Sequence, residues 1–144
     1  MNAVVLSVML QVVGAGGDAA PASYEAAYRA AESNGQPIVV LVGADWCPHC
    51  QTMKSGVLAR MLRNGKLSRV NYAVVNSDRE RELAGKLMHG GSIPQLIVFS
   101  KKNATEWSRD QITGAAGEDT VAAMIDRAAK TSEVAAANAA SATK

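Results

Sequence analysis

Three stretches of the chain are almost wholly apolar, and each is short enough to be a single β-strand. Residues 38–43, IVVLVG, are the clearest case, because they are rich in β-branched side chains and contain no polar position. Such a run is typical of a strand that is buried on both faces. Residues 69–77 and 94–100 predict a second and a third strand. After a turn at 101–103, residues 105–112 predict an antiparallel partner for the third strand.

Helical spacing of apolar positions predicts four helices around these strands. They cover residues 24–35, 48–63, 79–89 and 118–130. Ser23 and Asp78 stand where the first and third of these helices need an N-cap. From residue 38 the predicted order is β-α-β-α-β-β-α, with one helix in front. Alternating β and α units predict an α/β fold with parallel strands, to which the late hairpin adds an antiparallel edge.

The two ends of the chain differ in composition from the part between them. Residues 3–13 are apolar, and an Ala-Pro-Ala match at 20–22 follows, as in a secretory signal and its cleavage zone. We therefore expect residues 1–22 to be a signal peptide of an exported, periplasmic or extracellular protein. No Lys or Arg precedes the apolar run, so the alternative is a disordered arm on a cytoplasmic protein. The Ala-rich residues 131–144 predict a disordered or frayed tail, which leaves residues 23–130 as the folded domain.

Length and charge narrow the expected partners. A chain of 144 residues predicts one domain, and we expect a monomer. The formal net charge of +2, without a run of Lys or Arg, does not favour nucleic acid as a partner. The apolar N-terminal run is too short to cross a bilayer, so stable membrane insertion is not expected.

The chain has two cysteines, Cys47 and Cys50, which lie in the sequence WCPHC between the first predicted strand and the following helix. A pair at this spacing can be a metal clamp, a structural staple or a redox couple. Pro48 is favoured as the first residue of a helix, so Cys47 is predicted to be the N-cap. The unpaired N–H groups and the dipole of the helix start then favour its thiolate. Cys50, one turn further on, would be the resolving cysteine.

His49 lies between the two cysteines. A protonated imidazole there would stabilise the attacking thiolate and make the couple more oxidising, and the alternative is an exposed helix residue without a role. A structural zinc site takes four ligands, and His89 would have to join the three of the motif. We do not expect such a site, because Pro48 and His49 inside the pair would be unusual for it. A haem is not expected either, because Gln51 rather than His follows Cys50.

The WCPHC sequence, with Ser-Ile-Pro ahead of a later apolar strand, resembles the thioredoxin superfamily over residues 23–130. The resemblance implies a thioredoxin fold, with a central mixed sheet flanked by helices. It implies that the peptide bond between Ile93 and Pro94 is cis and lies beside the disulfide. By the same resemblance, Ile93 would offer its backbone to an extended substrate and Pro94 would shape the groove. Trp46 would form an apolar wall, unless it only fills the core, and Gly114 would lie near the groove.

The sequence departs from thioredoxins proper at the site. Pro48 and His49 stand where thioredoxins carry Gly-Pro, and this dipeptide looks like that of the oxidising, periplasmic disulfide-forming branch. That branch carries an inserted helical domain, for which this chain has no room. Leu41 occupies the place of a buried Asp that helps to deprotonate the second cysteine, and Asp45 is expected to be a solvated charge. The proton of Cys50 would therefore leave through His49 or water.

The resemblance implies a thiol–disulfide oxidoreductase. The Cys47 thiolate would attack a disulfide of a protein or peptide, and Cys50 would resolve the mixed disulfide, or the same steps would run in reverse. Such a protein needs a redox partner that resets the pair, but no bound cofactor. The direction stays open. One alternative is a thioredoxin-like binding module for a peptide partner or a metal ion, and another is a domain that serves a single client.

Overall fold

The computed structural model describes residues 20–143, so most of the predicted signal peptide lies outside the described residues. Its elements are α1 (Tyr24–Asn34), β1 (Ile38–Gly43), α2 (Pro48–Gln51), η1 (Thr52–Leu58), α3 (Ala59–Arg63), β2 (Asn71–Asn76), α4 (Arg81–Leu87), β3 (Gln95–Lys101), β4 (Trp107–Thr113) and α5 (Glu118–Ser141). The four strands form one sheet in the order β2-β1-β3-β4. Strand β1 pairs in parallel with β2 and antiparallel with β3, and β4 pairs antiparallel with β3. The mixed α/β sheet is confirmed, but β3 was expected to run parallel to β1 and runs the opposite way.

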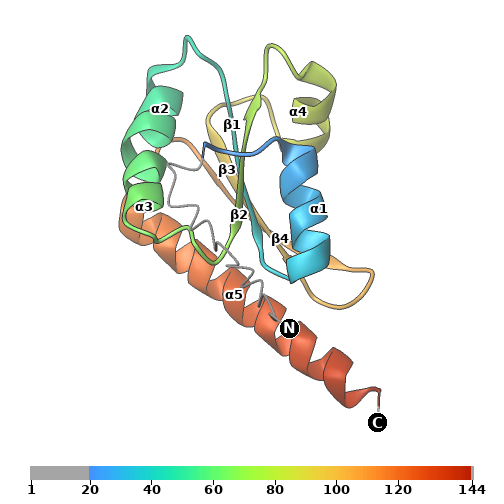
Figure 1. Cartoon of the computed structure of the whole chain (residues 1–144). Helices are drawn as coiled ribbons and strands as arrows, with labels where there is room; N and C mark the ends of the chain where they lie inside the picture. The colour runs from blue at the N-terminus through green and yellow to red at the C-terminus, as the bar shows by residue number, and fades with distance from the viewer. Residues whose placement is uncertain (1–19, 144) are drawn as a thin grey trace, which may run out of the picture.

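Helices cover both faces of this sheet (Figure 1). Alternate residues of β1 and β3 point to opposite faces of the sheet, so each strand contributes side chains to two apolar cores. On one face, Val39, Leu41 and Leu96 pack with buried side chains of η1, α3 and α5. On the other, Val40 and Ile97 pack with α1 and α4. The all-apolar sequence of β1 follows from this, because all six of its residues are buried.

The N-terminal helix begins and ends as the sequence predicted. The Ser23 side chain accepts a hydrogen bond from the Ala26 N–H at 3.2 Å, and Gly35 closes the helix at φ +70°. One residue earlier, the Ala22 N–H donates to the Tyr72 carbonyl of β2 at 3.0 Å. The backbone is thus attached to the edge of the sheet already at the last residue of the segment that we assigned to a signal peptide or arm.

The helix after the cysteines is not uniform. We predicted one α-helix over residues 48–63, but seven residues in its middle, η1, are π-helical. The Thr52 hydroxyl donates to the Pro48 carbonyl at 3.1 Å, and Gly56 stands inside the segment. A hydroxyl that bonds back to the preceding turn and a flexible glycine both favour such a local widening of the helix.

Asp78 does not cap the third predicted helix. The Asn76 side chain instead accepts from the Asp78 and Arg79 N–H groups, at 3.0 and 3.1 Å. This Asx turn extends the loop after β2, so α4 begins only at Arg81. Asp78 is thereby left free for a contact with the WCPHC motif.

The C-terminal segment is helical where the sequence predicted disorder or fraying. Helix α5 continues to Ser141, although its buried residues end at Ser132 (Figure 1). Alanine has the highest helix propensity, and extending a helix that packing has already nucleated gains one hydrogen bond per residue. The Ala-rich composition that we interpreted as a tail therefore supports a projecting helix.

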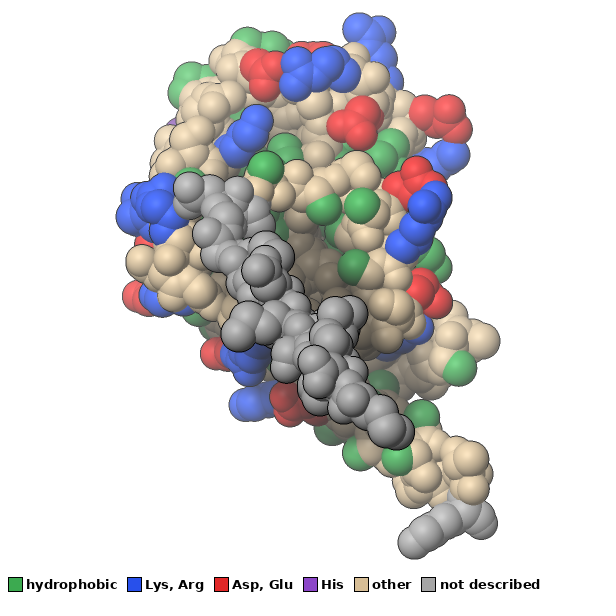
Figure 2. Space-filling view, viewed as in Figure 1, with side chains coloured by type: hydrophobic (Ala, Val, Ile, Leu, Met, Phe, Trp, Pro, Cys, Tyr) green, Lys and Arg blue, Asp and Glu red, His purple; other side chains and the backbone are tan. Residues whose placement is uncertain are grey.

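The charge distribution of the surface and the composition of the helices concern two of the expected partners, nucleic acid and membrane. Lys and Arg side chains lie interspersed with Asp and Glu on the face that Figure 2 shows. Within residues 20–143, no helix combines the length and the apolar composition that crossing a membrane requires.

Candidate active site

The two cysteines form a disulfide at the start of α2. Cys47 is the N-cap, with φ −90° and ψ 114°, and Pro48 is the first helical residue, as predicted. The Cα atoms of Cys47 and Cys50 are 5.2 Å apart. Among the N–H groups of the helix start, that of Cys50 donates to the Cys47 Sγ at 3.2 Å. The chain therefore folds locally so that the N-terminal end of the helix lies at the Cys47 Sγ.

Burial does not separate the roles of the two cysteines in this oxidised form. The exposed fraction is 5% for Cys47 and 3% for Cys50, so both side chains are buried to nearly the same degree. What separates them is position, because Cys47 caps the helix and Cys50 lies inside its first turn. His49, between them, is exposed.

The end of β1 leaves room for the disulfide only because it is a glycine. A Cβ at Gly43 would lie 2.9 Å from the Cys50 Sγ and 3.0 Å from the Cys50 Cβ. Both distances are shorter than an ordinary van der Waals contact. The sequence did not by its pattern single out this residue, although a glycine that ends an apolar strand four residues before Cys47 was a visible signal.

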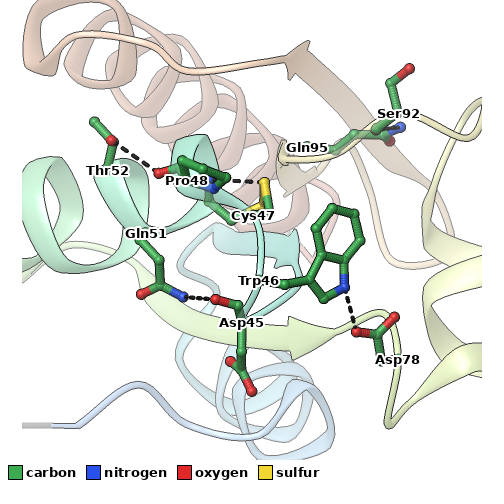
Figure 3. The surroundings of a disulfide bond; sticks show 10 residues. Asp45, Trp46, Cys47, Pro48, Gln51, Thr52, Asp78, Ser92 and Gln95 are labelled. Carbon is green, nitrogen blue, oxygen red and sulfur yellow. Dashed lines mark hydrogen bonds between the residues drawn. A yellow bond between two sulfur atoms is a disulfide. The ribbon is translucent and has the colours of Figure 1, made fainter.

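Trp46 and Asp45 connect the motif to the loop after β2. The Trp46 Nε1–H donates to Asp78 Oδ2 at 2.9 Å (Figure 3). The Asp45 carboxylate pairs with Arg79 at 2.8 Å. Trp46 is 71% exposed, so the alternative that it fills the core is wrong. Its indole instead lies beside the disulfide and is oriented by the Asp78 carboxylate, a role that no local pattern around Asp78 predicted.

The second predicted part of the site lies against the first. Ile93 packs on the apolar cluster of Ala44, Cys47 and Cys50, and the peptide bond between Ile93 and Pro94 is cis. The Pro94 carbonyl accepts from the Gly114 N–H at 2.8 Å. Gly114 has φ +94°, a conformation that glycine adopts without strain. Ile93 thus lies against the cysteine cluster, and Gly114 is joined to the same segment through Pro94.

A cavity of about 220 Å³ lies on the other side of Cys50. Leu41 lines it and is buried, so β1 supplies no carboxylate to Cys50 at the position where thioredoxins are expected to have one. The ionisable side chains at the cavity wall are Asp45, Lys54, Arg79 and Glu80. The rest of its lining includes apolar side chains such as Leu41 and Val74, and the ionisable groups give water molecules in it polar partners next to the Cys50 side chain.

No metal site forms around the pair in the part of the chain that the structure describes. Among residues 20–143, no three His, Cys, Asp or Glu side chains gather closely enough to hold an ion. His89 lies in the exposed loop before β3, where its backbone N–H and carbonyl bond to the Gln95 side chain. The four ligands that a zinc clamp would need therefore do not converge.

Two further residues shape the site without having been predicted. Gln95 directly follows Pro94 and is completely buried. Its signal was a polar residue at the start of an otherwise apolar strand. Met53 is also fully buried, and its sulfur accepts from the Ala116 N–H at 3.1 Å, which joins η1 to the loop after Gly114.

A bonded Cys-X-X-Cys pair at a helix N-terminus, set against a cis-proline on a mixed four-stranded sheet, defines a thioredoxin fold with a redox-capable dithiol. The family model described as thioredoxin-like matches residues 19–101. The chain therefore belongs to the thioredoxin-like family.

Solved thioredoxins have the same fold. A thioredoxin from Thermus thermophilus is 23% identical, with a TM-score of 0.57, over 73% of this chain and 82% of its own. A Trichomonas vaginalis thioredoxin is 23% identical, with a TM-score of 0.59, over 74% and 92%. A Fasciola hepatica thioredoxin is 24% identical, with a TM-score of 0.55, over 70% of this chain and 89% of its own. No curated protein sequence matches the chain.

Proposed function

We propose that the protein is a thiol–disulfide oxidoreductase that acts on disulfides or dithiols of proteins or peptides. The observation that carries this proposal is the Cys47–Cys50 disulfide at a helix start, with Ile93 packed against it. Family membership supports the general chemistry, because a close cysteine pair on this fold can exchange two electrons with another dithiol. The substrate class rests on the exposed Trp46 and on the backbone of Ile93, which lie beside the sulfurs.

In the reducing direction the Cys47 thiolate attacks one sulfur of a substrate disulfide. The substrate S–S bond breaks, one substrate thiolate leaves, and a mixed disulfide with Cys47 forms. Cys50 then loses its proton and attacks the Cys47 sulfur, which releases the second substrate thiolate. Both electrons come from the cysteine pair, which ends as the disulfide. A dithiol partner must reduce the pair again, and in the opposite direction an oxidising partner must restore the disulfide.

We propose that the Cys50 proton passes to water in the cavity behind it. Leu41 cannot accept a proton, and the cavity reaches Cys50 with the Asp45 and Glu80 carboxylates at its wall. The Glu80 carboxylate also accepts from the Asn76 N–H at 2.9 Å, which fixes it at the end of β2. In this route, water and the carboxylates at the cavity wall take the part that the buried Asp is expected to play in thioredoxins.

Two variants test the function. Cys47→Ser should abolish the reduction of insulin by dithiothreitol above the uncatalysed rate, because the attacking sulfur is gone. Cys50→Ser should still attack and should accumulate a mixed disulfide with a peptide, visible by mass spectrometry. A Cys47→Ser protein that reduces insulin like the wild type, or a pair without a reversible redox equilibrium with glutathione, would leave a peptide-binding module instead.

We also propose export, from the apolar run and small residues within positions 1–22. Mass spectrometry of the mature N-terminus after expression in a bacterium tests it. A cleaved chain recovered from the periplasm is the expected result, and an intact N-terminus in the cytoplasm would contradict it.

A further inference from the structure

The segment between α4 and β3 brings Ile93 and Pro94 to the disulfide without regular secondary structure. Its residues 89–92 are all exposed, and they include Gly90, at φ +81°, and Gly91. Such a segment has little conformational preference of its own. Every hydrogen bond that residues 89–92 make within the described part of the chain goes to one side chain, that of Gln95.

The Gln95 side-chain amide has a partner for each of its hydrogen-bonding groups. Its Oε1 accepts from the His89 N–H at 3.1 Å and from Gln111 Nε2 at 2.9 Å. Its Nε2 donates to the carbonyls of His89, at 3.0 Å, and Ser92, at 2.9 Å. Burying an amide costs free energy unless all its groups are paired, and the next three residues of β3 are buried and apolar. A buried position in this strand favours an apolar side chain. We therefore attribute the presence of an amide at residue 95 to the hydrogen bonds that it makes with the loop 89–92.

The bond to Ser92 determines the orientation of the Ile93 N–H. The Ser92 carbonyl and the Ile93 N–H belong to one planar peptide unit, which is trans. Holding the carbonyl toward Gln95 therefore turns the Ile93 N–H away from it. No described group accepts a hydrogen bond from this N–H, although Ile93 itself packs against the cluster of Ala44, Cys47 and Cys50. Figure 3 shows Gln95 and Ser92 together, close to the disulfide and Trp46.

We propose that Gln95 is a positioning residue that makes the protein selective for disulfides within extended peptide segments. By fixing the peptide unit of Ser92 and Ile93, it keeps a free N–H beside Cys47 for a main-chain carbonyl of the substrate. Pairing of this kind adds an extended peptide to a protein backbone, and a small disulfide without a peptide backbone gains nothing from it. The inference rests on the proposed function, since it concerns how that function selects its substrate.

The test compares two substrates in the Gln95→Met variant, which keeps the length of the side chain and removes the amide. With dithiothreitol as reductant, KM for insulin should rise about tenfold, the equivalent of about 1.4 kcal/mol. The variant's kcat for insulin and its rate with hydroxyethyl disulfide should stay within about twofold of the wild-type values, because only peptide binding is weakened. Its reduction potential should change by no more than the equivalent of a twofold change in the redox equilibrium constant. Gln111→Met is the matched control. It removes the bond from Gln111 to Gln95 Oε1, leaves the three loop bonds in place, and should leave KM for insulin unchanged.

A second measurement does not require a Gln95 variant to fold. In the Cys50→Ser protein, with a peptide attached to Cys47 as a mixed disulfide, hydrogen exchange of the Ile93 amide should slow at least about tenfold relative to the free protein. Unchanged exchange of this amide, or an equal change of KM for insulin and hydroxyethyl disulfide in Gln95→Met, would overturn the inference while the proposed function stands. A wild-type protein that reduces neither substrate would overturn the function and this inference with it.

Discussion

Gly43→Ala is the substitution that most directly probes the contact between the sheet and the disulfide. The added Cβ would lie 2.9 Å from the Cys50 Sγ and 3.0 Å from the Cys50 Cβ. Cys50 cannot easily move aside, because it is 3% exposed, bonded to Cys47 and part of the first turn of α2. Forcing an extra methyl group into a packed site costs about 1–3 kcal/mol. At roughly 4 °C for each kcal/mol, Tm of the oxidised protein should fall by about 4–12 °C.

Gly85→Ala is the matched control, since no heavy atom lies within 4 Å of a Cβ at this position in α4. Removing a glycine from a helix interior should stabilise the protein by about 0.5–1 kcal/mol, so the two variants should change stability in opposite directions. Urea denaturation of the oxidised protein measures both, with a shifted midpoint and an unchanged m-value.

The redox state provides a further readout of the same contact. In the reduced protein the Cys50 Sγ can rotate away from residue 43, whereas its Cβ cannot. Gly43→Ala should therefore destabilise the oxidised form more than the reduced form, and the reduction potential should rise. If Gly43→Ala and Gly85→Ala proved equally stable in the oxidised state, the reasoning from the Cβ contacts would be refuted.

Three other predictions follow from the site and its supports. His49→Ala should lower the reduction potential by tens of millivolts, where 30 mV corresponds to about 1.4 kcal/mol, because an imidazole whose protonated form would favour the Cys47 thiolate is removed; an unchanged potential in glutathione equilibration would leave His49 without that role. Asp78→Ala should release the Trp46 indole and lower its fluorescence anisotropy in a Trp107→Phe background, with a stability loss of at most about 1 kcal/mol because the bond is exposed; unchanged anisotropy would show that Asp78 does not hold the ring. Hydrogen bonds from Arg60 and Lys66 lower the pKa of Glu118 below its ordinary 4.5, so its stabilising contribution is complete above pH 4.5 and is lost as the pH falls through the lower folded-state pKa. Glu118→Gln should accordingly flatten the acid side of the curve of stability against pH, and an unaltered curve would contradict this.

The outline of the fold could be predicted from the sequence because it depends on local patterns. A continuous apolar run at 38–43, rich in β-branched residues, determines a strand buried on both faces. Ser23 and Gly35 determine the ends of α1 through backbone geometry that a single residue controls. The N-cap position of Cys47 follows in the same way from Pro48 beside it.

Other features depended on contacts between distant residues, which local patterns do not contain. Strand β3 runs antiparallel to β1, and nothing in its own apolar pattern distinguishes that direction from the parallel one. Asp78 was predicted to cap a helix, yet Asn76 turns the loop first and Asp78 bonds to Trp46 instead. The tail at 131–141 is helical because α5 is already held by packing before it reaches solvent.

The sequence by itself determined which residues carry the chemistry, because two cysteines separated by Pro48 and His49 need only a helix start to become a redox pair. Only the tertiary structure decided what surrounds that pair. Gly43 lies against Cys50 because the end of β1 packs next to α2. The Gln95 amide bonds to the Ser92 carbonyl because the chain folds back between α4 and β3. Both depend on distances that arise when separate elements pack together, and no local pattern of residues specifies them.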